Sequence, residues 1–414
     1  MKTIILFLSM LLASPLLKSC SNSVIDEGEV TDIELDLKSE QIVEADNAFG
    51  LELLREVNAE LDEGKNLMIS PLSVSLALAM VYNGADGDTK TQMEMVLHKA
   101  GLTSKQINQA YKTLVAALGS HDPKVELSIA NAIFHRDDFS VKPDFISTNQ
   151  DYYDAEVEAL NFGNEDATLN RVNGWVKDKT RDKIDKIIEQ VSEYDIMYLI
   201  NAIYFNGKWT YQFKKGDTSD RPFYTGNGAE LQVPTMMLEP TTLHYTSTST
   251  FELLELPYGS EKYSMLLFLP KADHSTNEVI DSMNPSALNG WLENMHESNL
   301  KVYLPKFEFE YDNSLVDNLK SLGMTNAFAP GLSDFSGIAD RSDLFISEVK
   351  HKTFVKVDEE GTEAAAATGV TVGVTSVGPE PVFRVDRPFV FAIREKDTNA
   401  FLFLGKVNNP LLHE

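Results

Sequence analysis

The spacing of apolar residues predicts two helices in the first third of the chain. Apolar side chains recur every three or four positions between residues 44 and 61, which is typical of an amphipathic helix. A second helix is expected to begin at Ser70, because serine is a favourable N-cap residue and Pro71 suits the first helical turn. Residues 76–80 are apolar at every position, so this helix is expected to be buried until it ends near Gly84.

The rest of the chain is rich in short segments that favour β-strands. Residues 265–269 are apolar at every position, which is typical of a strand covered on both faces of its sheet. Helices and strands interleave without a regular βαβ alternation, and no linker interrupts residues 41–414. This pattern predicts a single α+β domain with helices packed on large mixed β-sheets. The predicted strands are 127–134, 198–205, 251–256, 264–269, 301–304, 354–357, 389–393 and 400–407.

The N-terminal segment has the composition of an export signal. Residues 4–17 form a mostly apolar run that is too short to span a bilayer, so residues 1–19 are predicted to be a signal peptide. Cys20 is the only cysteine, and its position after this run resembles a bacterial lipoprotein processing site, at which the cysteine is lipidated. Lys18 departs from that pattern, so cleavage of a plain secretory signal is the alternative.

Residues 20–40 are polar and acidic and lack a sustained apolar stripe, which predicts a flexible tether. We therefore expect an exported monomer that meets a membrane only through a lipid at Cys20. It would be a bacterial outer-membrane or cell-surface lipoprotein, or a protein released to the extracellular space. Because no second cysteine exists, the stability of the domain must come from its hydrophobic core.

Composition and charge exclude several classes of function. The chain has 43% hydrophobic and 24% charged residues, which is ordinary for a globular protein. Its formal net charge of −27 repels nucleic-acid phosphates, so no nucleic-acid partner is expected. The sequence lacks a nucleophile elbow, a zinc-protease helix motif, a phosphate-binding loop and a Cys-x-x-Cys pair, and its eight histidines are scattered. We therefore expect no enzymatic activity, no cofactor and no metal.

The segment 361–388 is unusual for a surface loop. Loops this long are uncommon and usually functional or disordered. Its residues alternate with a period of two, as in a strand with one buried face, yet four glycines disfavour an isolated strand. The segment is therefore suited to a loop that lies outside and later enters a sheet, although a plain Ala/Gly-rich loop is the simpler interpretation. The small or apolar alternate positions are Thr362, Ala364, Ala366, Thr368, Val370, Val372 and Val374.

Residues 359–366 read Glu-Glu-Gly-Thr-Glu-Ala-Ala-Ala, which resembles the acidic-Gly-Thr-Glu-Ala-Ala hinge of the serpins. Further short motifs, in the family's order, extend the resemblance over nearly all of residues 41–410. Each match is weak alone, but their number and order identify the chain as a serpin-like protein. The motifs are NLMISPLS at 66–73, NAIYFNGKW at 201–209, LPKF at 304–307, DFSGI at 334–338, VKHK at 349–352, RPFVF at 387–391 and LGKV at 404–407.

The resemblance implies a metastable inhibitor of serine proteases with an exposed reactive loop. A protease cleaves the loop and forms an acyl-enzyme, and the cut loop then inserts as a strand into the central sheet. The rival within the family is a non-inhibitory binding protein, which typically has larger or charged hinge residues. The resemblance assigns the hinge to Glu360, Gly361, Thr362, Glu363, Ala364, Ala365 and Ala366. It assigns the shutter, a polar cluster beneath the strands that open, to Ser70, Ser73, Asn201 and His351. It assigns the breach, where the loop first enters the sheet, to Trp209.

The family's spacing also bounds the bond that a protease would cut. Counting from Gly361 gives the bond between Thr375 and Ser376, whereas counting back from Pro388 gives a cut after Val377. Val374 is a further alternative. No lysine or arginine occurs between Lys356 and Arg384, so a trypsin-like pocket would find little to bind. We expect elastase-like or subtilisin-like proteases as partners, held in a covalent complex.

Overall fold

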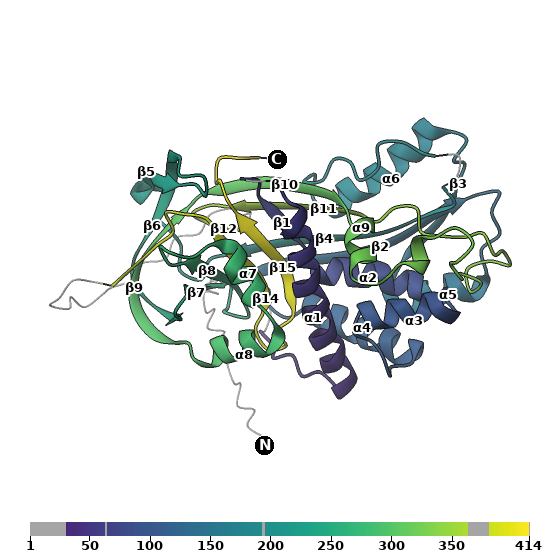
Figure 1. Cartoon of the computed structure of the whole chain (residues 1–414), viewed down its shortest axis with the longest axis horizontal. Coiled ribbons are helices and arrows are strands. Elements are labelled where there is room, and N and C mark those ends of the chain that lie inside the picture. Colours follow the sequence, from purple (N-terminus) through teal and green to yellow (C-terminus); the bar gives the residue numbers. More distant parts are fainter. Residues whose placement is uncertain (1–29, 63, 193–194, 363–380, 414) are drawn as a thin grey trace, which may run out of the picture.

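The computed structural model describes residues 30–62, 64–192, 195–362 and 381–413, and two large β-sheets dominate it (Figure 1). The predicted α+β class is confirmed. The helices are α1 Leu37–Glu60, α2 Pro71–Tyr82, α3 Gly87–Val96, α4 Ser104–Gly119, α5 Pro143–Tyr153, α6 Glu165–Lys179, α7 Thr276–Ser282, α8 Pro285–Glu293 and α9 Val316–Ser321.

The larger sheet has nine strands in the described part of the chain, and β8 and β14 lie side by side near its centre. Both are buried at every position, which confirms the expectation for residues 265–269. In spatial order the strands are β1 Leu67–Ile69, β15 Phe401–Val407, β14 Phe389–Glu395, β8 Tyr263–Pro270, β7 Phe251–Tyr258, β6 Glu230–Ser247, β9 His296–Pro305 and β13 Val382–Arg384, and β5 Ser219–Tyr224 pairs with β6.

The second sheet has six strands in the described residues, and helices cover both of its faces (Figure 1). Ala132 and Phe134 of its β2 strand pack against Trp175 of α6, whereas Ile133 joins the core on the opposite face. This alternation follows from the two-residue period of a strand. In spatial order the strands are β10 Phe307–Ser314, β11 Lys350–Val357, β12 Gly361–Thr362, β4 Met197–Lys208, β2 Val125–Arg136 and β3 Glu156–Leu160.

Both predicted helices form, but α1 begins earlier than its apolar pattern indicates. The side chain of Asp36 caps α1 by accepting hydrogen bonds from the backbone N–H groups of Lys38 and Ser39, so the helix starts at Leu37. The Ser70 side chain caps α2 as expected, accepting from the backbone N–H of Ser73. Side-chain capping therefore fixes both helix starts.

The flexible tether predicted for residues 20–40 does not extend over residues 31–40. The backbone N–H of Ile33 donates to Asp397 at 2.9 Å, and that of Thr31 donates to the carbonyl of His121 at 3.3 Å. These tertiary contacts leave no periodic signal in the sequence. Cys20 and the rest of residues 1–29 lie outside the described residues, and no described helix is long and apolar enough to cross a membrane.

Each predicted strand overlaps an observed one, but the long strand β6 had no predicted counterpart. Its two prolines, Pro234 and Pro240, argue against a strand because proline cannot donate to a ladder. The pairing of β6 with β9 shifts register between Leu238 and Thr241, and this irregularity accommodates Pro240.

We expect Phe268→Ala to lower the free energy of unfolding by about 3–5 kcal/mol, because the truncation leaves a cavity in a packed aromatic cluster. Phe268 is fully buried in β8, and its ring centroid lies 5.7 Å from that of Phe251 and 6.2 Å from that of Trp291. Urea unfolding provides the measurement. Leu332→Ala, at a side chain that is 67% exposed, is the control and should change stability little.

Candidate functional site

Two of the three described hinge residues, Gly361 and Thr362, already lie inside the six-stranded sheet. Strand β12 is inserted between β11 and β4, with Thr362 opposite Val357 on one side and opposite Gly207 on the other. A Cβ atom at Gly361 would lie 2.1 Å from the carbonyl oxygen of Gly207, so only glycine fits there. The side chain of Thr362 is 4% exposed, and its hydroxyl is hydrogen-bonded to that of Tyr258 at 2.6 Å.

Glu359, just before the hinge, and Glu360, the first hinge residue, are buried and paired with cations. Lys306 lies 2.8 Å from a carboxylate oxygen of Glu359, and the Thr218 hydroxyl donates to the other oxygen at 2.7 Å. Burial opposes ionisation of Glu359, but these hydrogen bonds and the charge of Lys306 outweigh it and hold its pKa below the usual range. Glu360 forms an ion pair with Lys215. The carboxylates therefore fix the chain where it enters the sheet.

Trp209, assigned to the breach, contacts this entry point directly. Its indole stacks on the ring of Tyr258, with centroids 4.4 Å apart and planes 11° apart. The indole N–H donates to the carbonyl of Asp358 at 2.9 Å, and the backbone N–H donates to the carbonyl of Glu360 at 3.0 Å. Trp209 therefore packs beneath the hinge and donates hydrogen bonds to the backbone of Asp358 and Glu360.

The structure brings three of the four shutter residues into one hydrogen-bonded cluster. The backbone N–H of Ser70 donates to Nε2 of His351 at 3.0 Å, and the backbone N–H of Ser73 donates to the Ser70 hydroxyl oxygen at 3.2 Å. Burial lowers the pKa of His351 to about 4. The imidazole is therefore neutral at physiological pH, and its Nε2 accepts a hydrogen bond.

Asn201 lies beside this cluster and bonds to a different partner. Its side-chain N–H donates to Oδ1 of Asn131 at 2.8 Å, and Asn131 in turn donates to the carbonyl of Tyr153 at 2.7 Å. Asn201, Ser73 and His351 all line the same cavity. The four shutter residues are thus neighbours, but they form two hydrogen-bonded groups.

A cavity of about 500 Å³ lies between strands β4 and β11. It is lined by residues 196–202 before and within β4, by residues 343–352 leading into β11, and by the buried helix α2. Among the described residues, β4 and β11 are joined only through β12. Beyond that short strand no described residue pairs β4 with β11, so the described sheet is split there. A chain continuing from Thr362 between the two strands would run into the cavity.

Several residues at this site belong to none of the sequence motifs. Tyr258, Thr218, Lys215 and Asn131 come from separate elements and meet the assigned residues only in the fold. Lys306 was part of a matched motif, but its pairing with Glu359 was not foreseen. The remaining assigned residues lie outside the described part of the chain: Glu363, Ala364, Ala365, Ala366, Val374, Thr375, Ser376, Val377 and Cys20.

Comparison with known proteins settles the family of this chain. Residues 44–410 match the family model described as serpin, serine protease inhibitor. The chain belongs to the serpin family. Iripin-2 of Ixodes ricinus is 37% identical over 374 residues, which cover 89% of this serpin and 93% of that protein. The leukocyte elastase inhibitor of Xenopus tropicalis is 34% identical over 381 residues, covering 90% and 100% of the two chains.

Solved structures agree with this assignment. The thermophilic serpin tengpin in its native state matches with a TM-score of 0.82 and 34% identity, covering 93% of this serpin and 98% of tengpin. Human thyroxine-binding globulin matches with a TM-score of 0.81 and 27% identity, covering 91% and 100% of the two chains. Many serpins inhibit serine proteases, and the family is one of inhibitors and not of catalytic enzymes. The solved structure of thyroxine-binding globulin is described as a complex with thyroxine.

We expect acid to destabilise the native state through His351. Its pKa is 6.5 in an ordinary setting and about 4 in the fold, so between these values the unfolded chain binds a proton that the native protein does not. The contribution of His351 to the free energy of unfolding is therefore complete above pH 6.5. It falls by up to about 3 kcal/mol as the pH drops to 4.

Urea unfolding between pH 4 and 7 measures this contribution. His351→Gln should flatten the pH dependence by about the stated amount, whereas His296→Gln, at an exposed position of β9, should not. An equal pH dependence in the native protein and in His351→Gln would contradict the role assigned to His351.

Proposed function

We propose that this serpin is a suicide-type inhibitor of serine proteases whose bait is the segment 361–388. The observation that carries the proposal is the position of Gly361 and Thr362, which already lie between β11 and β4 at the mouth of the split. The small buried side chain at Thr362 and the cavity beyond it suit a strand that enters from this end.

The proposed mechanism couples cleavage to strand insertion. The protease serine attacks the scissile carbonyl, forms an ester with the N-terminal part of the loop and releases the amine of the next residue. The freed strand then enters between β4 and β11 and carries the attached protease with it. Each new ladder hydrogen bond contributes about 1 kcal/mol, so a strand of several residues supplies a substantial driving force.

We further propose elastase-like or subtilisin-like targets. The segment between Lys356 and Arg384 contains no basic residue, and the candidate cut sites are flanked by valine, threonine and serine. The name of the Xenopus tropicalis relative, leukocyte elastase inhibitor, agrees with such a preference. The two ways of counting along the loop place the bond at Thr375–Ser376 or after Val377.

A second candidate function is ligand binding without inhibition. Thyroxine-binding globulin has the same fold, and its solved structure is described as a complex with thyroxine. The described part of the hinge argues against this candidate, because Gly361 and Thr362 retain the small residues that insertion requires.

The N-terminal assignments remain proposals from the sequence. They comprise a signal peptide over residues 1–19, lipidation at Cys20 and a monomer exported to the outer membrane or cell surface of a bacterium. Docking of residues 31–33 on the domain shortens the flexible part of the proposed tether.

We expect the purified protein to form a covalent complex with at least one elastase-like or subtilisin-like serine protease. The complex should survive SDS and appear as a shifted band on a gel, because the ester is trapped before hydrolysis. Mass spectrometry of the released peptide should place the cut within residues 374–377. No complex with any protease of a broad panel, together with no gain in heat stability after loop cleavage, would refute inhibition.

Replacement of Thr362 by arginine should convert the inhibitor into a substrate. The position is buried between β11 and β4 where the loop enters the sheet, and an unpaired charge there costs several kcal/mol. The substitution therefore disturbs the entrance, so insertion of the following residues slows and the ester is hydrolysed first. The stoichiometry of inhibition should rise at least tenfold while the loop is still cut. Leu332→Arg, at an exposed position, is the matched control and should inhibit normally. Unchanged inhibition by Thr362→Arg would favour the binding protein.

A further inference from the structure

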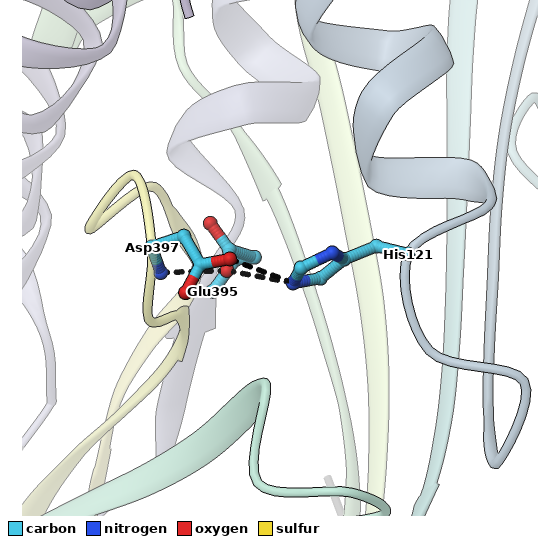
Figure 2. A group of neighbouring side chains, drawn as sticks. All are labelled: His121, Glu395 and Asp397. Carbon is cyan, nitrogen blue, oxygen red and sulfur yellow. Dashed lines mark hydrogen bonds and ion pairs between the residues drawn. The ribbon is translucent and has the colours of Figure 1, made fainter. Parts of the chain in front are cut away.

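A buried cluster outside the hinge brings together one histidine and two carboxylates (Figure 2). His121 lies between α4 and β2, Glu395 ends β14, and Asp397 lies in the turn between β14 and β15. Nε2 of His121 is 3.1 Å from Oε1 of Glu395 and 3.5 Å from Oδ2 of Asp397. All three atoms lie within 4.8 Å of one another and face a common point.

Neighbouring groups hold both carboxylates in place. The backbone N–H and the hydroxyl of Thr398 donate to Oε2 of Glu395 at 2.8 and 2.6 Å. The Lys262 ammonium lies 3.1 Å from Oδ1 and 2.9 Å from Oδ2 of Asp397, and the backbone N–H of Ile33 donates to Oδ2 at 2.9 Å. The backbone N–H of Asp397 donates to Oε1 of Glu395 at 2.7 Å, so a metal ion would share both carboxylate ligand oxygens with these donors. Such outer contacts are what orient the ligands of a metal ion in proteins.

The imidazole is also fixed and has one nitrogen available to the cluster. The ring of His121 meets that of Tyr263 edge-on, with centroids 5.9 Å apart. Its Nδ1 is buried and has no hydrogen-bond partner among the described residues, so Nε2 is the ring nitrogen that acts in the cluster. The side chains of His121 and Glu395 are fully buried, whereas that of Asp397 is 24% exposed and leaves a route for an ion.

Charge favours a cation at this point. The two carboxylates carry two negative charges, and the Lys262 ammonium, which also pairs with Asp32, compensates at most one of them. The remaining negative charge is buried in part, and a buried charge without compensation is unfavourable. A divalent cation bound between the three ligand atoms would supply the compensation.

We propose that Nε2 of His121, Oε1 of Glu395 and Oδ2 of Asp397 bind a zinc-type divalent metal ion. Tetrahedral bonds of about 2.0–2.1 Å separate neighbouring ligand atoms by roughly 3.3 Å, close to the two distances from Nε2. The two carboxylate oxygens lie within 4.8 Å of each other and would approach one another to reach this spacing. Three protein ligands leave the fourth position for water.

The ligand set selects the kind of ion. An imidazole with carboxylates suits zinc and its transition-metal neighbours, whereas calcium requires about six to eight oxygen ligands. No motif in the sequence predicts this site, because His121 lies 274 residues before Glu395 along the chain. The expectation of no metal rested on that lack of a motif.

A bound ion would tie three parts of the fold together. They are the connection before β2, the turn between β14 and β15, and the N-terminal segment that docks on Asp397 through Ile33. Because the ion binds the folded chain, it should raise the melting temperature.

Isothermal titration of the metal-free protein with Zn²⁺ tests the proposal. We expect one equivalent to bind, and Co²⁺ in its place should give the visible absorption of a tetrahedral site. His121→Gln and Asp397→Asn should each weaken binding at least about 100-fold, since even loss of an outer contact typically costs about 10–100-fold. Asp397→Asn alters the least buried ligand and keeps the test valid if His121→Gln fails to fold.

His274→Gln is the matched control. His274 forms a surface pair with Glu278 at 2.7 Å, so it reports adventitious binding to an ordinary His–Glu pair. Its removal should leave the affinity and the cobalt spectrum unchanged. Absence of stoichiometric binding, or equal affinity in Asp397→Asn and the unaltered protein, would show that the cluster is a hydrogen-bonded His–Glu pair without a metal and would overturn the proposal.

Discussion

The fold depends on how backbone hydrogen bonds are completed between β4 and β11. Buried peptide groups must be paired, because an unpaired one loses the hydrogen bond that water supplied. In the described part of the chain, the two residues of β12 make the only strand connection between them, and beyond it both strands border a cavity of about 500 Å³. The sheet can accept another strand there. Such a strand must pass β12, so the residues at that position must be small.

The entrance is rigid because it lies where the two sheets meet. Trp209 follows β4, and Tyr258 ends β7 of the other sheet, so their stacked rings join the sheets directly beneath the hinge. Tyr258 also bonds the Thr362 hydroxyl, and Lys306 pairs with Glu359 just before the hinge. Aromatic packing and buried ion pairs together hold the start of the loop in register while leaving the space beyond it open.

Buried polar groups recur at the places where distant segments meet. His351 is neutral and accepts a hydrogen bond from the backbone N–H of Ser70, the N-cap residue of α2, so it links β11 to this helix. Lys99 resembles an ordinary surface lysine in the sequence, yet it is buried and paired with Asp46 at 3.0 Å. Such groups are tolerated only because each finds a specific partner, which makes them sensitive to small changes in packing.

The sequence by itself determined the α+β class, the second helix, most strand positions and the hinge pattern, because local periodicity and capping act over a few residues. It also indicated through the small hinge residues how a loop could become a strand. Only the tertiary structure decided that Glu359 pairs with Lys306, that Asn201 bonds Asn131, and that residues 31–33 dock on the domain. These contacts join segments far apart in the chain, and their strength depends on burial, which no local pattern encodes.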